Sequence, residues 1–196
     1  MPELRYLRAV NLALADALAA DPSIVVFGED VSEAGGSFGA TRGLRERFGA
    51  ERVFDTPISE AAIAGAAVGA ALSGLRPVIE IMFMDFTTLV MDALVNQAAK
   101  ARFMFGGQRS VPIVLRTPHG GGLGAGPQHS QCLEAWFAHV PGLKVVCPAD
   151  PASAYGLLRA AIADPDPVIV VENKALYAMK AEVPEVLEEV PIGRAA

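Results

Sequence analysis

The stretch that decides the fold is RVFDTPISEAAIAGAAVGAALSGLRPVIEI, residues 52–81. Two apolar periodicities alternate along it, and they predict a strand at 53–55, a helix over 60–75 and a second strand at 78–81. A helix between two short apolar strands is typical of a crossover connection, which makes the two strands parallel. The stretch therefore predicts a strand-helix-strand unit of a parallel sheet.

The same alternation continues on both sides of this unit. The wholly apolar run IVVFG at 24–28 indicates a strand that is buried on both faces. The remaining predicted strands are 112–116, 144–147 and 168–172, and the remaining helices are 6–20, 41–48, 86–105, 130–138 and 151–163. Together they predict a three-layer α/β fold, with a six-stranded, mostly parallel sheet and helices on both faces.

The alternating pattern ends after Glu172. The tail EVPEVLEEVPIGRAA is acidic and punctuated by proline, which is typical of a linker. We expect one domain over residues 1–180, and a linker over 181–196 that leads towards a further, C-terminal domain.

The composition excludes several classes of protein. The 196 residues include 16 Lys and Arg against 22 Asp and Glu, for a formal net charge of −6, and 52% are hydrophobic against 19% charged. A chain so rich in apolar residues is not intrinsically disordered. An acidic chain without a basic run is not expected to bind nucleic acid. The low charged fraction predicts that partners cover part of the surface.

Cysteine usage and hydropathy indicate the compartment. Cys132 and Cys147 form no CxxC motif, which fits a reducing environment. The N-terminal sequence MPELRYLRAV lacks the apolar core of a signal peptide. The most apolar stretch, 61–75, is shorter than the roughly 20 residues that span a bilayer. We expect a cytoplasmic or organellar protein with no membrane partner.

Ligands of open parallel sheets bind at the carboxyl ends of the strands, where Glu60 follows the strand at 53–55. Glu60 starts a helix built almost entirely of Ala and Gly. It is either an acidic residue that favours a helix N-terminus capped by Ser59, or a carboxyl group that holds or shares a proton with a closely approaching ligand.

A glycine-rich loop, TPHGGGLGAGPQHS at 117–130, follows another strand. It is either a flexible surface loop or a functional one, and its length at this end of the sheet favours function. His129 at its end can act as an acid or a base near neutral pH. His119, His129 and His139 lack the spacing of metal ligands, so we expect no zinc site built from these three.

Two aromatic residues and two acids complete the candidates. Phe83 and Phe86 follow the strand at 78–81, either as core residues or as a platform for a flat ring. Glu29 and Asp92 are acids among apolar neighbours. An acid in such surroundings usually pairs with another group or takes part in proton transfer.

A serine hydrolase is a weaker alternative. The run GGSFG at 35–39 matches G-x-S-x-G, and Ser37, Asp85 and His129 occur in the chain order of an α/β-hydrolase triad. The nucleophile of that fold sits where a strand turns directly into a helix, whereas residues 29–36 separate Ser37 from its strand.

Six motifs in order carry a family resemblance: GEDV (28–31), RVFDTPISEA (52–61), GLRPVIEIMFMDF (74–86), QHSQ (128–131), EAWFAHVPGLKVV (134–146) and DPDPVIVVEN (164–173). Through them the chain resembles the β subunit of thiamine-diphosphate-dependent 2-oxoacid dehydrogenases, the E1 component of pyruvate, branched-chain and acetoin dehydrogenase complexes. The resemblance implies the pyrimidine-binding domain of the transketolase-like, thiamine-diphosphate-binding fold.

The resemblance also implies roles for individual residues. Glu60 corresponds to the glutamate that bonds N1′ of the cofactor's aminopyrimidine, with Phe86 stacked on that ring and Ile58 in apolar contact beside it. His129 corresponds to the histidine that handles protons near the reaction centre. Glu29 and Asp92 correspond to acids of a polar tunnel that links two active sites.

Further ligands and partners follow from the same resemblance. It implies a structural potassium ion held at Ile113, Ala161, Asp164 and Asp166. An E1 α subunit is expected to hold Mg²⁺ and the diphosphate, and a second β copy to complete a heterotetramer. A lipoyl-bearing E2 is expected to bind through the C-terminal domain.

The implied activity is oxidative decarboxylation of a 2-oxoacid, with acyl transfer to E2. Gln128 and the run VVEN at 170–173 favour pyruvate or acetoin over branched-chain substrates. A non-catalytic assembly domain of the same complex is the alternative.

Overall fold

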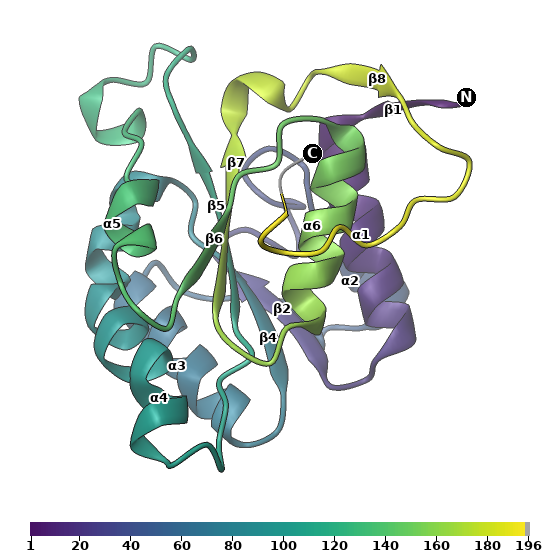
Figure 1. The fold of residues 1–196 in the computed structure, drawn as a ribbon. Coiled ribbons are helices and arrows are strands. Elements are labelled where there is room, and N and C mark those ends of the chain that lie inside the picture. Colours follow the sequence, from purple (N-terminus) through teal and green to yellow (C-terminus); the bar gives the residue numbers. More distant parts are fainter. Residues whose placement is uncertain (195–196) are drawn as a thin grey trace.

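The computed structural model describes residues 1–194. Six strands form one sheet in the order β3-β2-β4-β5-β7-β6 (Figure 1). They are β2 (Ile24–Gly28), β3 (Val53–Asp55), β4 (Arg76–Glu80), β5 (Val114–His119), β6 (Lys144–Val146) and β7 (Val168–Asn173). Every neighbouring pair is parallel, which confirms the predicted sheet.

Helices cover both faces of the sheet, which confirms the three-layer α/β architecture (Figure 1). One face carries α1 (Tyr6–Ala20), α2 (Leu44–Phe48) and α6 (Pro151–Ala163), and the other carries α3 (Glu60–Leu72), α4 (Ala99–Met104) and α5 (Glu134–Ala138). None of the helices between residues 1 and 194 is long and apolar enough to cross a membrane.

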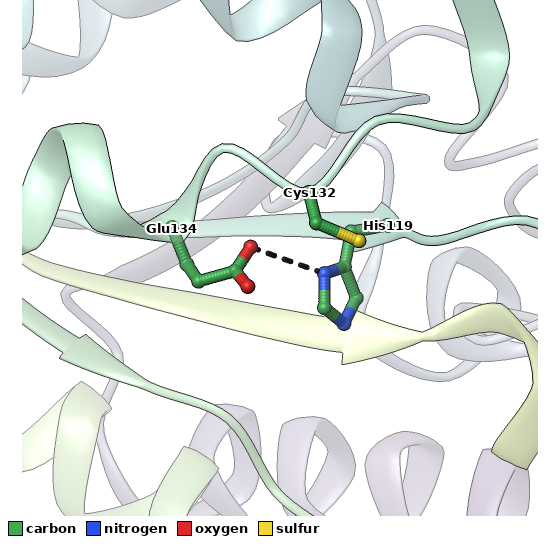
Figure 2. A group of neighbouring side chains, drawn as sticks. All are labelled: His119, Cys132 and Glu134. Carbon is green, nitrogen blue, oxygen red and sulfur yellow. Dashed lines mark ion pairs between the residues drawn. The ribbon is translucent and has the colours of Figure 1, made fainter. Parts of the chain in front are cut away.

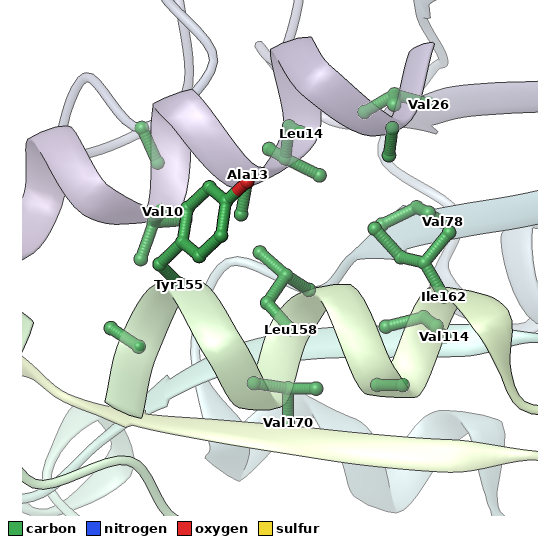
Figure 3. Packing of buried hydrophobic residues seen from close by; sticks show 14 of the residues in the cluster. Val10, Ala13, Leu14, Val26, Val78, Val114, Tyr155, Leu158, Ile162 and Val170 are labelled. Carbon is green, nitrogen blue, oxygen red and sulfur yellow. The ribbon is translucent and has the colours of Figure 1, made fainter. Parts of the chain in front are cut away.

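Alternating side chains of the central strands enter two separate cores. In β2, Val26 belongs to the core under α1 and α6, whereas Val25 and Phe27 belong to the core under α3. Figure 3 shows Leu14 of α1 and Leu158 of α6 meeting in the first of these cores. Burial on both faces explains why the run at 24–28 is wholly apolar.

A charged network crosses the middle of the sheet. Arg116 of β5 is 2% exposed. Its Nη1 donates to Glu80 Oε2 on β4 at 2.8 Å, and its Nε and Nη2 donate to the Glu172 carboxylate on β7 at 2.8 and 2.9 Å. The Tyr177 hydroxyl also donates to Glu172, at 2.9 Å. Burial raises the pKa of Glu80, while Arg116 and the Ser37 backbone N–H oppose this rise.

The predicted helix over 86–105 is confirmed as a helical segment over 84–104, but it is not one regular α-helix. The chain instead forms a 3₁₀ helix, η1 (Met84–Val90), a π-helical segment, η2 (Asp92–Ala98), and then α4. The Thr87 and Thr88 hydroxyls donate to the carbonyls of Met84 and Asp85, three residues back, at 2.6 and 3.0 Å. Apolar periodicity does not distinguish 3₁₀, π and α turns, so it could not predict these changes of helix type.

The predicted helix over 130–138 begins four residues later, at Glu134. Asp85 accepts hydrogen bonds from the Gln131 backbone N–H and side-chain amide, at 3.3 and 2.8 Å. The Leu133 backbone N–H donates to Met84 Sδ at 3.2 Å. These contacts across the fold hold residues 131–133 outside the helix.

A segment near the N-terminus and a segment that follows β7 form a second sheet that the sequence pattern did not predict. β1 (Glu3–Arg5) pairs antiparallel with β8 (Lys180–Glu182). Further along the tail, the Val190 backbone N–H donates to the Gly156 carbonyl at 3.1 Å. A Cβ at Gly156 would lie 2.5 Å from Val190 Cγ2, so this part of the predicted linker packs tightly on α6. The linker assignment stays a prediction, and its residues 195–196 lie outside the described part.

Candidate active site

The site candidates gather at the carboxyl edge of the parallel sheet. Glu29 directly follows β2, η1 with Phe86 follows β4, and Lys174 directly follows β7. His119 is the last residue of β5 and opens the glycine-rich loop that leads to His129. Because the strands are parallel, these segments leave the sheet at the same edge.

Two buried carboxyl groups, those of Glu29 and Glu60, influence each other electrostatically at the start of α3. Glu60 is the first residue of this helix and is buried, as is Glu29. Burial raises the pKa of Glu29, and the negative charge of Glu60 raises it further. Glu29 Oε1 is buried and makes no hydrogen bond to the residues that the structure describes. Glu29 can therefore hold a proton or present an acceptor to a ligand.

The capping alternative for Glu60 is only partly supported. Glu60 does occupy the first turn of α3, but the Ser59 side chain makes no capping hydrogen bond. Ile58, two residues before Glu60, is 81% exposed. An exposed isoleucine beside a buried carboxyl group is suited to contact with an apolar ring.

Three rings form an aromatic group around His129. Its imidazole packs edge-on against Phe83 and Phe86, with centroids 4.7 and 5.2 Å away. The Phe83 and Phe86 centroids are 6.1 Å apart. All three residues are partly exposed, so each can contact a ligand as well as its neighbours.

Lys174 is a residue to which sequence reasoning gave no role. It is buried, its Nζ donates to the His129 carbonyl, and this nitrogen lies 4.9 Å from the Phe83 centroid. Burial lowers the pKa of Lys174, while the charge of Asp85 opposes the shift. A lysine directly after a buried strand was the available signal, but its contact with His129 depends on the fold of the loop.

The structure does not assemble the serine-hydrolase triad. Ser37 is exposed, and Asp85 bonds the Gln131 side chain and backbone. Within residues 1–194, no hydrogen bond joins Ser37, Asp85 and His129. The geometry therefore gives this alternative no support.

Asp92 lies apart from the aromatic group. It begins η2, is exposed, and accepts a hydrogen bond from Asn96 Nδ2 at 2.7 Å. It lines a cavity of about 350 Å³ with small apolar residues that include Ala61 and Gly65 of α3. Its neighbours are apolar as expected, while its carboxylate faces solvent.

The residues expected to hold potassium already have partners. Lys144 Nζ lies 2.7 Å from Asp164 Oδ2, and Arg102 Nε lies 2.6 Å from Asp166 Oδ1. The Ile113 carbonyl accepts the Val168 backbone N–H at 2.9 Å. Both carboxylates thus face cations of the chain itself, so a potassium ion here would depend on carbonyl oxygens. The potassium site stays a prediction.

Comparisons with known proteins agree with the sequence resemblance. The family model described as the pyrimidine binding domain of transketolase matches residues 3–180. The pyruvate dehydrogenase E1 component subunit beta of Acholeplasma laidlawii is 51% identical over 196 residues, or 100% of this chain and 60% of that protein. The 2-oxoisovalerate dehydrogenase subunit beta of Bacillus subtilis (strain 168) is 46% identical over 100% of this chain and 60% of that protein.

A solved structure shares the fold. The chain matches a structure described as "Split gene transketolase, inactive beta4 tetramer", with a TM-score of 0.67 and 22% sequence identity. The match covers 93% of this chain and 54% of the other chain. The chain spans about half the length of the curated relatives it matches. Since the family model covers almost the whole chain, the chain belongs to the family of transketolase pyrimidine-binding domains.

Proposed function

We propose that this domain forms half of the active site of a 2-oxoacid dehydrogenase, an oxidoreductase, as part of the β subunit of its E1 component. The observation that carries the proposal is the buried Glu29–Glu60 pair at the edge of the sheet that also carries Phe86 and His129. Such an edge offers a proton-holding carboxyl group and apolar ring contacts, which an aminopyrimidine requires.

The residues present fit thiamine diphosphate. Glu29 Oε1 is a buried acceptor without a partner among the described residues, and Ile58 and Phe86 leave apolar surface open. The cofactor, when bound, supplies a carbon nucleophile for the decarboxylation of a 2-oxoacid. Glu60 would hold a proton at N1′ of the bound pyrimidine, and Phe86 and Ile58 would supply the apolar contacts to its ring.

The second carboxyl group supports this proton transfer. Its raised pKa lets Glu29 keep a proton at a pH where an exposed glutamate would lose it. Glu29 can therefore act as a source of protons for Glu60. Asp92, at the start of η2, is assigned by the family resemblance to a polar tunnel towards a second active site, and this role is part of the proposal.

His129 handles a proton on the substrate side. An imidazole is a side chain that can give or take a proton near neutral pH. The T-shaped contacts with Phe83 and Phe86 and the Lys174 bond to its backbone carbonyl restrict the position of the imidazole.

Pyruvate is the proposed substrate. Relatives named for pyruvate dehydrogenase are 46–51% identical, and the relatives named for 2-oxoisovalerate and acetoin are each 46% identical. Gln128 and the run at 170–173 agree with this choice.

The proposed partners are an E1 α subunit, which holds Mg²⁺ and the diphosphate, a second β copy, and a lipoyl-bearing E2 that binds through a further domain. Exposed apolar side chains of Ile58, Leu89, Phe103 and Trp136 give these partners surface to cover. The heterotetramer would reside in a bacterial cytoplasm or an organellar matrix. A potassium ion at residues 113, 161, 164 and 166 is part of the proposal.

Glu60→Gln tests the proposal in a complex with an E1 α subunit. We expect 2-oxoacid decarboxylation, followed with an artificial electron acceptor, to fall at least about 100-fold, because a positioned acid or base contributes about 10²–10⁴-fold. Glu46→Gln, on the exposed surface of α2, is the matched control and keeps wild-type turnover.

Two outcomes would contradict the proposal. Wild-type turnover in Glu60→Gln would remove Glu60 from the chemistry. Failure of the α-supplemented wild-type chain to bind thiamine diphosphate with Mg²⁺ would instead favour the assembly role.

A further inference from the structure

Three side chains with different metal-ligating atoms meet beside the glycine-rich loop (Figure 2). His119 ends β5, Cys132 lies at the far end of the loop, and Glu134 begins α5. The ligand atoms of all three lie within 4.8 Å of one another. Figure 2 shows the Glu134 carboxylate directed at the imidazole, with the thiol of Cys132 next to the same ring.

Two of these atoms are buried without a hydrogen bond. His119 is 9% exposed, and neither its Nδ1 nor Glu134 Oε2 has a hydrogen-bond partner among the described residues. The two atoms are 3.3 Å apart and form an ion pair when the imidazole is protonated, but their geometry does not make a hydrogen bond. Buried polar atoms almost always have a partner, so this pair requires an explanation.

The spacing matches two ligands of one metal ion. Zinc lies about 2.0–2.2 Å from imidazole nitrogen and carboxylate oxygen, so two such ligands of a tetrahedral ion are about 3.4 Å apart. The observed 3.3 Å between Nδ1 and Oε2 agrees with that separation. A thiolate, an imidazole and a carboxylate together are ligands typical of zinc among divalent ions.

We propose that His119, Cys132 and Glu134 bind one Zn²⁺ ion, with water as the fourth ligand. Cys132 is exposed and Glu134 is partly exposed, so the ion and the water can enter from solvent. The site does not depend on the function proposed above.

The ion ties together the two ends of the glycine-rich loop. The Gly120 backbone N–H donates to the Gln131 carbonyl at 3.3 Å, which already brings these ends together. A bond from His119 and another from Cys132 to one ion strengthen that closure. Because His129 lies within the loop, the ion restricts the segment that carries this residue.

Zinc affinity of the 196-residue chain tests the proposal, measured by competition with a chromophoric chelator. We expect one ion per chain. His119→Gln and Cys132→Ser should each weaken binding more than about 100-fold, because outer-shell substitutions alone cost about 10- to 100-fold. His139→Gln, at an exposed histidine that follows α5, is the matched control and keeps wild-type affinity. Circular dichroism establishes that each variant is folded.

Thiol labelling of the unmodified chain gives a second readout. Both cysteines are exposed, so both react with an alkylating reagent in the absence of metal. Zinc should protect Cys132 and leave Cys147 reactive, as peptide mass spectrometry would show. Equal labelling of Cys132 with and without zinc, or wild-type affinity in Cys132→Ser, would overturn the proposal.

Discussion

Replacing Arg116 by methionine removes the only cationic member of the network between β4, β5 and β7. The substitution breaks hydrogen bonds of 2.8, 2.8 and 2.9 Å and leaves the Glu80 and Glu172 carboxylates buried. Removing one partner of a buried ion pair costs about 3–5 kcal/mol, because the remaining charge is not compensated. We expect the free energy of unfolding to fall by about 4 kcal/mol. For a chain of this length that corresponds to a decrease in Tm of about 8–16 °C.

Thermal and urea unfolding, followed by circular dichroism, measure this loss. Arg109→Met removes an exposed arginine and is the matched control, with an expected change within about 0.5 kcal/mol. The combination of Arg116→Met with Glu80→Gln and Glu172→Gln should recover part of the stability, because it no longer buries unpaired carboxylates.

The pH dependence distinguishes a charge effect from a packing effect. Burial already raises the pKa of Glu80, and Arg116 opposes that rise, so its removal raises the pKa further. A carboxyl group with a raised folded-state pKa contributes stability that is present at low pH and lost as the pH rises through that pKa. The Arg116→Met deficit should therefore be larger at neutral pH than at acidic pH. A deficit below about 1 kcal/mol, or one that is equal at both pH values, would refute the reasoning.

Two further predictions concern the site. In the wild type, the raised pKa of Glu29 makes ionisation of this carboxyl group destabilise the fold as the pH rises. Glu29→Gln removes this ionisation, so the variant should be more stable than wild type above that pKa and equally stable in acid. A pH series of Tm values checks this, with Glu33→Gln as the exposed control, and a constant difference across pH would contradict it. Lys174→Met removes the bond to the His129 carbonyl and should lower kcat about 10- to 100-fold by displacing the imidazole. Its Tm should stay close to wild type, and Lys180→Met is the exposed control. Unchanged kcat and pH profile in Lys174→Met would rule out a positioning role.

Some residues of the site could be predicted from the sequence, whereas others are brought together only by contacts between segments that are distant along the chain. The motif residues Glu60, Phe86 and His129 could be named from the sequence, because each lies just after a predicted strand or at a loop end. The group formed by His119, Cys132 and Glu134 could not, because no short spacing relates the end of β5 to the start of α5. The contact of Lys174 with His129 likewise could not be predicted, because it depends on how the glycine-rich loop folds.

Apolar periodicity by itself determined the parallel sheet, its six strands and the helices on both faces, because burial on two faces favours a continuous apolar run such as that of β2. It also determined α1 and α6 to the residue, and in α6 a proline and the Asp150 capping box mark the start. Only the tertiary structure decided the break of the 84–104 segment into three kinds of helix, the late start of α5, and the pairing of β1 with β8. In the last two of these the deciding hydrogen bonds run from side chains to backbone or between distant parts of the chain, and such bonds leave no period in the sequence.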